Sequence, residues 1–279
     1  MKISKFTVGT IIVWGLVNIG LVAVIPSYDD EDKTEIILTP DIISKFDSLH
    51  TQVVSAKSNA LINLQARLLK PDRIEESKKY PLVVSLHGAG ERGSDNQQQL
   101  KYLPQQMTTD PWRETYACFL LAPQCPSNMN WSSSAILADS SEEKDQNLLD
   151  QIHKMILDVT SKYPIDKRRV YITGYSMGGF GTWDMIARYP DTFAAAVPVC
   201  GGGNPKTVSR FFEMPIWVVH GDADQIIPVS ASRDMVDALQ KAGGCPIYKE
   251  LRGVTHNSWT HAYTYQSDML TWLFKQEKK

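Results

Sequence analysis

Short apolar runs separated by helix-length segments constrain the fold of this chain more than any other feature of its sequence. From Pro81 onward they read PLVVSLHG, CFLLAPQ, RVYITGYS, FAAAVPVCGG and PIWVVHGD, and a more polar run, IYKELRG, follows. Strands that are apolar on both faces are typical of parallel sheets covered by helices. The segment from Asp145 to Ser161 fits such a helix, because its apolar residues recur at i, i+3 and i+4. The pattern predicts an α/β fold with a mostly parallel central sheet and helices on both faces.

A different pattern precedes these runs. TPDIISKFDSLH places Pro40 and Asp41 ahead of apolar residues at helical spacing, which predicts a short helix. HTQVVSAK and ALINLQARLLKP then have strand-like composition and are separated by Ser58 and Asn59. We therefore expect a hairpin that enters the sheet.

The N-terminal segment Phe6–Ile25 carries no charge and approaches the length needed to cross a bilayer. Lys2 and Lys5 precede it and an acidic run, 29–32, follows it, so the positive-inside rule places the N-terminus in the cytoplasm and the main domain outside. A cleaved signal peptide is the alternative, although the sequence after the apolar run offers only poor cleavage sites. Either interpretation predicts an exported protein, anchored in a membrane or secreted.

The rest of the chain has the composition of one enzyme-sized domain, with 43% apolar residues in a total of 279. We divide the chain into an anchor or signal peptide (1–25), a polar tether (26–35) and one α/β domain (36–279). The formal net charge is −2 and the charges are spread along the chain, so no basic surface for nucleic acid is indicated.

The four cysteines form no Cys-x-x-Cys pair and have no closely spaced histidine partners. We expect buried free thiols, and neither a zinc site nor a thioredoxin-like centre. These residues are Cys118, Cys125, Cys200 and Cys245.

The stretch YITGYSMGGFGTW places a serine between glycines where a predicted strand meets a predicted helix. In Gly-x-Ser-x-Gly at such a junction, Gly174 and Gly178 allow a turn too tight for side chains, and Ser176 projects its hydroxyl above the strand ends. An ordinary glycine-rich turn is the alternative. The strand-to-helix context favours a nucleophile elbow.

A serine nucleophile needs a histidine base and an acid, in the order Ser, Asp, His for this arrangement. HGDADQIIP offers Asp222 and Asp224 after a strand, and we choose Asp224 because it lies farther along the loop, while Asp222 caps or braces it. His256 follows the last strand on a loop and is the predicted base, whereas the rival His261 falls within a helix. The other histidines precede the nucleophile or sit in His-Gly pairs at strand ends: His50, His87, His153 and His220.

The same chemistry requires backbone N–H groups aimed at the oxyanion of the tetrahedral intermediate. The loop LHGAGERG after the first parallel strand can supply one of them. We assign the two donors to the N–H groups of Ala89 and Met177, with Gly90 as the alternative for the first.

Together, PLVVSLHGAGERGSDN, LAPQCP, YITGYSMGGFGTWDMIARYPDTFAAAVPVCGGG, HGDADQIIPV and GVTHNSW resemble the α/β-hydrolase superfamily. Within it the chain is similar to bacterial esterases labelled predicted peptidases, near the phospholipase/carboxylesterase and dienelactone hydrolase groups, over roughly residues 50 to 276. The resemblance implies an α/β-hydrolase fold and a triad of Ser176, Asp224 and His256. Dienelactone hydrolases proper use a cysteine nucleophile, so the serine argues against that reaction.

Other residues near these motifs are candidate substrate contacts. Glu91, with Arg92 and Asp95, can contact a polar substrate or brace its loop through ion pairs. Three tryptophans can line a sugar or aryl site or pack the interior: Trp112, Trp131 and Trp259.

We therefore expect a serine hydrolase that cleaves carboxylic esters through an acyl-enzyme, without a metal or organic cofactor. The predicted partner is a small-molecule ester, with an acylated saccharide as one candidate, and the catalytic domain faces the periplasm or the exterior. A serine peptidase acting on short peptides is the alternative enzyme. A non-catalytic binding module on the same scaffold is the alternative from another class.

Overall fold

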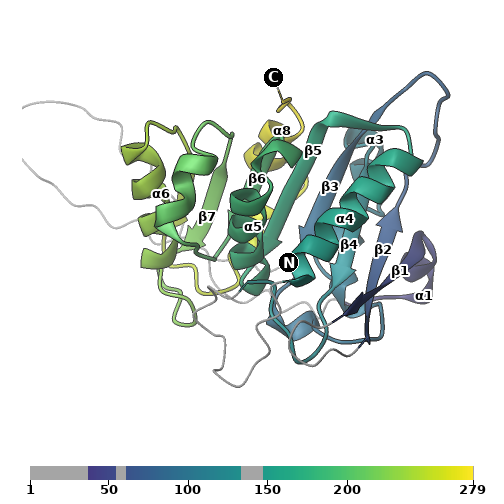
Figure 1. The fold of residues 1–279 in the computed structure, drawn as a ribbon, viewed down its shortest axis with the longest axis horizontal. Coiled ribbons are helices and arrows are strands. Elements are labelled where there is room, and N and C mark those ends of the chain that lie inside the picture. Colours follow the sequence, from purple (N-terminus) through teal and green to yellow (C-terminus); the bar gives the residue numbers. More distant parts are fainter. Residues whose placement is uncertain (1–36, 55–60, 133–146, 279) are drawn as a thin grey trace, which may run out of the picture.

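The computed structural model describes residues 37–54, 61–132 and 147–278, and its centre is one sheet with the strand order β1-β2-β4-β3-β5-β6-β7-β8 (Figure 1). The pairs β1–β2 and β2–β4 are antiparallel, and the other neighbours are parallel. This arrangement confirms the predicted α/β fold. The strands are β1 (Phe46–Val54), β2 (Leu61–Leu69), β3 (Tyr80–Leu86), β4 (Phe119–Gln124), β5 (Ile165–Tyr175), β6 (Ala195–Val199), β7 (Trp217–Gly221) and β8 (Ile247–Leu251).

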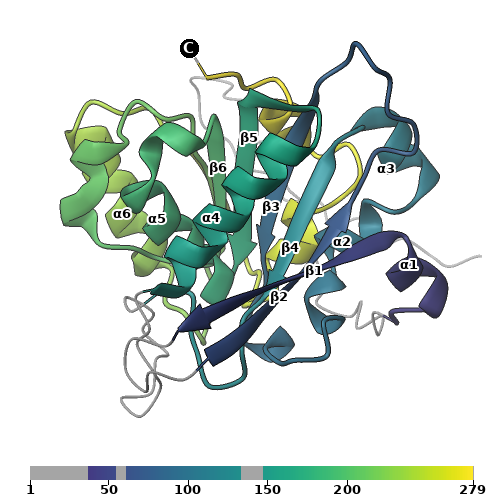
Figure 2. The same cartoon turned by 45° about the vertical axis from the view of Figure 1, so that its right-hand side comes forward.

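The predicted hairpin forms the edge of the sheet, where β1 and β2 lie side by side (Figure 2). The short helix α1 (Pro40–Ser44) precedes it, and the Thr39 hydroxyl caps this helix by accepting the Ile42 N–H. Strand β1 begins at Phe46, which precedes the run HTQVVSAK that predicted the strand, because the Phe46 side chain is buried in the core.

Helices cover both faces of the sheet (Figures 1 and 2). Residues of α4, α5 and α6 pack with one set of strand side chains, and residues of α2, α3, α7 and α8 pack with the alternate set. The helices are α2 (Leu103–Gln106), α3 (Asp110–Thr115), α4 (Asn147–Lys162), α5 (Met177–Arg188), α6 (Ser230–Lys241), α7 (Trp259–Ala262) and α8 (Asp268–Leu273). Four 3-10 turns complete the set: η1 (Ala89–Glu91), η2 (Gln98–Leu100), η3 (Pro190–Thr192) and η4 (Pro205–Arg210).

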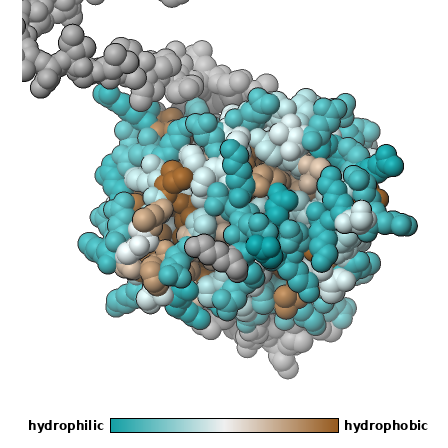
Figure 3. All heavy atoms as spheres, turned by 90° about the horizontal axis from the view of Figure 1, so that it is seen from above, coloured by the Kyte–Doolittle hydropathy of each residue, from teal (hydrophilic) through white to brown (hydrophobic). Residues whose placement is uncertain are grey.

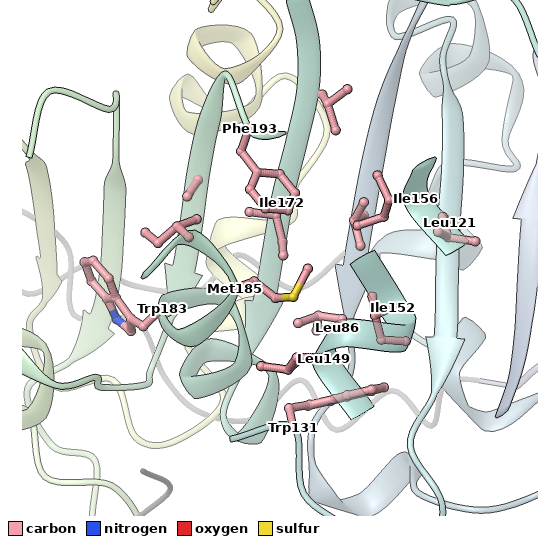
Figure 4. Packing of buried hydrophobic residues seen from close by; sticks show 14 of the residues in the cluster. Leu86, Leu121, Trp131, Leu149, Ile152, Ile156, Ile172, Trp183, Met185 and Phe193 are labelled. Atoms are coloured by element: carbon pink, nitrogen blue, oxygen red, sulfur yellow. The ribbon is translucent and has the colours of Figure 1, made fainter. Parts of the chain in front are cut away.

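Apolar side chains of α4 and α5 interlock with those of the central strands (Figure 4). Ile152 of α4, Met185 of α5 and Ile172 of β5 have no exposed surface. Burial of one such side chain contributes roughly 1.5–3 kcal/mol. The helical periodicity predicted over Asp145–Ser161 is confirmed by α4 within the described residues.

The face shown in Figure 3 is mostly hydrophilic, with small separate hydrophobic patches. Three cysteines are buried, but Cys245 is exposed in the turn between α6 and β8, so the expectation that all four are buried is wrong for this residue. All four are free thiols. The predicted anchor (1–25) and tether (26–35) lie outside the described residues, and none of the described helices has the length and apolar character needed to cross a bilayer.

The loops that follow the parallel strands meet at one edge of the sheet, because parallel strands all end on the same side. The predicted nucleophile and the proposed oxyanion donor Met177 follow β5, and the predicted acid, the predicted base and the donor Ala89 follow β7, β8 and β3 respectively. The fold therefore brings together side chains that are far apart in the sequence.

Candidate active site

The turn between β5 and α5 holds Ser176 in a strained backbone conformation, with φ 55° and ψ −119°. A Cβ atom at Gly174 would lie 2.4 Å from the Gly178 carbonyl oxygen, and one at Gly178 would lie 2.0 Å from the Leu86 carbonyl oxygen. Real Cβ atoms do not approach backbone this closely, so the turn requires both glycines. The Ser176 N–H donates to the Val199 carbonyl at 3.0 Å, which ties the turn to β6.

Ser176, His256 and Asp224 form one chain of hydrogen bonds. His256 Nε2 lies 2.9 Å from Ser176 Oγ, and His256 Nδ1 lies 2.7 Å from Asp224 Oδ2. A carboxylate only accepts hydrogen bonds, so the proton of the neutral ring is on Nδ1 and Nε2 is free to accept the serine proton. The His256 side chain is 20% exposed, so an incoming substrate can reach this end of the chain.

The Asp224 carboxylate is saturated with donors. Its Oδ1 accepts the N–H groups of Ile226 and Ile227, both at 2.9 Å, and its Oδ2 meets His256 and, at 3.2 Å, His220. Burial alone would raise the pKa of Asp224, but hydrogen bonds from His220, His256 and the two N–H groups outweigh it and hold the pKa well below its usual range. Asp224 therefore stays ionised at neutral pH.

The two rival residues lie outside this chain. The Asp222 carboxylate accepts the Gly253 N–H at 2.6 Å, so it braces the loops after β7 and β8, as its alternative role predicted. His261 lies in α7, and its side chain is not part of the contacts that join Ser176 to Asp224.

The proposed oxyanion donors lie at the starts of two helical turns. Ala89 begins η1 and Met177 begins α5, and the first N–H groups of a helix have no partner within it. The start of α5 lies against the segment that leads from β3 into η1, because a Cβ at Gly178 would lie 2.8 Å from the His87 carbonyl oxygen. A Cβ at Gly90 would meet nothing within 4 Å, so that glycine is not required by packing.

Glu91 is buried behind this loop. Its carboxylate accepts the Tyr175 hydroxyl at 2.8 Å, and burial raises the pKa of Glu91. A Cβ at Gly88 would lie 2.8 Å from the Tyr175 ring, so the loop passes directly over the residue before the nucleophile. Glu91 is 8% exposed, so its position matches the bracing role and not the substrate contact that the sequence also allowed.

The neighbouring charged residues brace the loop as well, through hydrogen bonds. The Arg92 guanidinium donates to the Ala89 and Met129 carbonyl oxygens. Asp95 accepts the Gln97 and Gln98 N–H groups and the Gln124 side-chain amide. The loop that carries Ala89, the proposed first oxyanion donor, is thus fixed along its length.

Two of the three candidate tryptophans are packing residues. Trp131 is 2% exposed and donates its indole N–H to the His87 carbonyl at 2.9 Å (Figure 4). Trp112 is buried against Tyr116 and Tyr265. The burial of Trp131 favours the packing role that the sequence also allowed, and its contact with substrate stays a prediction.

Trp259 lies beside the predicted base, together with a residue that the sequence did not single out. The Trp259 ring stands edge-on to His256, with the ring centroids 5.3 Å apart. The centroid of the Tyr102 ring lies 5.6 Å from that of Trp259 and 5.2 Å from that of Tyr175. Tyr102 and Trp259 are both partly exposed and form an aromatic wall next to His256. Tyr102 has φ 62°, which is rare for a tyrosine, and no sequence signal predicts it.

Cys200 is the third member of a group with Asp224 and His256 whose ligand atoms lie within 4.8 Å of one another. Burial raises the pKa of Cys200 to about 12, which disfavours the thiolate that metals bind. Both nitrogens of His256 already make hydrogen bonds to Ser176 and Asp224. An ion here would have to break these contacts, so the residues fit a metal poorly.

Comparisons with known proteins show which proteins this chain is similar to. A family model described as phospholipase/carboxylesterase matches residues 73–271. A thermostable esterase of known structure is 37% identical, with a TM-score of 0.74 over 85% of this chain and 64% of that chain. Poly(3-hydroxyalkanoate) depolymerase C of Paucimonas lemoignei is 30% identical over 126 residues, which are 44% of this chain and 28% of the depolymerase. A probable carboxylesterase of Arabidopsis thaliana, SOBER1-like, is 26% identical over 202 residues, 66% of this chain and 76% of the relative. The chain thus spans less than a third of the depolymerase.

Proposed function

The chain belongs to the phospholipase/carboxylesterase family of α/β-hydrolases, and from this premise we propose that it is a serine hydrolase that cleaves carboxylic esters through an acyl-enzyme. The observation that carries the proposal is the unbroken hydrogen-bond chain from Ser176 through His256 to Asp224. The three residues have the side chains, the order along the polypeptide and the hydrogen bonds that nucleophilic catalysis by serine needs.

In the proposed mechanism, His256 Nε2 takes the hydroxyl proton as Ser176 Oγ attacks the ester carbonyl. The resulting imidazolium is stabilised by the ionised Asp224 and then gives its proton to the leaving alcohol. In the second half, His256 deprotonates a water molecule that attacks the acyl-enzyme, and the acid is released with Ser176 restored.

The N–H groups of Ala89 and Met177 are the proposed oxyanion donors. Loss of one such donor typically costs about 2.7–4 kcal/mol of transition-state stabilisation. The hydrogen bond between Glu91 and Tyr175 supports this role, because it fixes the Ala89 loop against the strand that leads to the nucleophile.

The substrate is a small-molecule carboxylic ester. The aromatic wall of Tyr102 and Trp259 beside His256 favours a group with a flat face, either an aromatic acyl group or a sugar ring, so an acylated saccharide is one proposed substrate.

We further propose that the protein is exported. The uncharged segment Phe6–Ile25 and the charges that flank it support an anchor with the catalytic domain outside the cytoplasm. Intact-mass analysis of protein recovered from cells tests this: an intact N-terminus in a salt-resistant membrane fraction is expected. A mature N-terminus between residues 23 and 30 would instead identify a cleaved signal peptide.

A substrate panel and an active-site probe test the catalytic proposal. We expect hydrolysis of p-nitrophenyl esters and labelling of Ser176 by a fluorophosphonate, whereas Ser176→Ala folds and loses on the order of 10⁴- to 10⁶-fold in kcat. Ser161→Ala is a matched control, because its hydroxyl bonds the Asp158 carbonyl at the end of α4. Acetylated and feruloylated saccharides, thioesters and short peptide amides in the same panel separate the ester hydrolase from the peptidase alternative. Labelling at another serine would contradict the assignment.

A further inference from the structure

A second histidine contacts the same carboxylate oxygen as the catalytic base. His220, the fourth residue of β7, places Nε2 at 3.2 Å from Asp224 Oδ2, and His256 Nδ1 lies 2.7 Å from that oxygen. His220 has no exposed surface, so substrate cannot touch it. The mechanism above makes no use of this buried imidazole.

The surroundings of His220 Nε2 require a proton on that nitrogen. Besides Asp224 Oδ2, the Ile227 carbonyl oxygen lies 3.1 Å away. A carboxylate at neutral pH and a carbonyl oxygen only accept hydrogen bonds. His220 Nε2 is therefore the donor of both contacts.

The other ring nitrogen contacts a serine hydroxyl. His220 Nδ1 lies 2.8 Å from Ser232 Oγ in α6, and the same hydroxyl lies 2.8 Å from the Gly201 carbonyl oxygen. Ser232 thus joins the His220 ring to the segment after β6 and holds the ring in the orientation that points Nε2 at Asp224.

We propose that His220, held by Ser232, is a positioning residue that donates its Nε2–H to the catalytic carboxylate and so sets both the orientation of Asp224 and the share of its charge that reaches His256. This inference rests on the proposed function, because it assumes that Asp224 and His256 act on Ser176. The chain of contacts runs from Ser176 through His256, Asp224 and His220 to Ser232.

The expected consequence for pH dependence follows from sharing Oδ2. A donor on the carboxylate draws charge away from His256, so removing it stabilises the His256 imidazolium more strongly and moves the acid limb of kcat/KM to higher pH. Glu250, the partner of His220 on β8, is another charged group near it. Its carboxylate already accepts two hydrogen bonds from Arg233 of α6.

A pair of amide substitutions separates positioning from simple filling of space. In His220→Gln the side-chain nitrogen reaches the place of Nε2 and can still donate to Asp224, whereas in His220→Asn it reaches only the place of Nδ1, near Ser232. We expect His220→Asn to lose on the order of 10- to 100-fold in kcat, with little change in KM, because Asp224 is no longer held. His220→Gln retains a larger part of kcat. His153→Asn is the control, because His153 bonds Thr192.

The full-length protein is assayed with p-nitrophenyl acetate across pH, and the rate of fluorophosphonate labelling is measured in parallel. The acid limb of His220→Asn is expected about half a pH unit or more above that of the wild type. Ser232→Ala keeps the Nε2–H but removes the contact that holds the ring at Nδ1, so it weakens the same hydrogen bond to Asp224. We expect it to shift the limb in the same direction with a smaller loss of kcat, and it serves as the test if His220→Asn does not fold. Equal kcat in both His220 variants, or acid limbs unchanged in His220→Asn and Ser232→Ala, overturns the inference. A wild type that is not labelled at Ser176 contradicts the proposed function instead.

Discussion

Replacing Asp224 with asparagine should inactivate the protein, because no orientation of the amide satisfies its surroundings. The Ile226 and Ile227 N–H groups donate to Oδ1, so the amide oxygen has to face them and the NH₂ group has to face His256 Nδ1. The ring then loses its acceptor and carries its proton on Nε2, where it cannot accept the proton of Ser176. Turning the amide over restores the acceptor but points NH₂ at two backbone N–H groups that cannot move away.

The expected loss is about 10⁴-fold in kcat, which corresponds to roughly 5.4 kcal/mol of transition-state stabilisation. Asp222→Asn is the matched control, since Asp222 is exposed and the amide oxygen can still accept the Gly253 N–H. We expect its kcat to stay within about twofold of the wild type. Both variants are assayed on p-nitrophenyl esters after their thermal melts are compared. A loss below about 100-fold for Asp224→Asn, or an equal loss for Asp222→Asn, would refute the assigned acid.

Three further substitutions test the turns, the buried brace and the aromatic wall. Gly178→Ala places a methyl group 2.0 Å from the Leu86 carbonyl oxygen, so calorimetry should show a loss of about 3 kcal/mol and a melt lower by roughly 6–12 °C, while Gly90→Ala, with nothing within 4 Å, melts like the wild type. Burial raises the pKa of Glu91, so its ionised form destabilises the fold as pH rises from about 4.3 through that raised pKa. The melting temperature of Glu91→Gln minus that of the wild type should therefore increase with pH over this window, and a constant difference would contradict the shift. Trp259→Ala should lower kcat/KM for aromatic esters about tenfold more than for acetyl esters, and equal losses would argue against a substrate role.

The strands and the nucleophile turn could be predicted because their signals are local. Runs such as PLVVSLHG are apolar on both faces, and only glycine fits positions 174 and 178. The structure also brings together the predicted residues Ser176, Asp224 and His256, while their catalytic roles stay predictions. The choice of Asp224 over Asp222 depended on reach along one loop, which the sequence does show.

The missed features depend on contacts between distant segments. Nothing local distinguishes a buried Trp131, whose indole N–H donates to the His87 carbonyl, from one that lines a cleft. Nothing near Tyr102 indicates that its ring meets Trp259. His220 was recognised only as part of a His-Gly pair, because its partner Ser232 lies on the following helix. Cys245 was expected to be buried from the behaviour of cysteine in general, but it lies in an exposed turn.

Among the described residues with positive φ, Ser176 and Tyr102 lie at the candidate site. Ser176 has φ 55° and ψ −119°, and Tyr102 has nearly the same values, φ 62° and ψ −118°. Each such residue typically costs on the order of 1–3 kcal/mol and persists only where its surroundings fix it. Both residues keep backbone hydrogen bonds, since the Ser176 N–H donates to Val199 and the Tyr102 carbonyl accepts the Gln106 N–H. The same unusual conformation thus occurs in the proposed nucleophile, which contacts His256, and in Tyr102, whose ring contacts Trp259 of the proposed substrate wall.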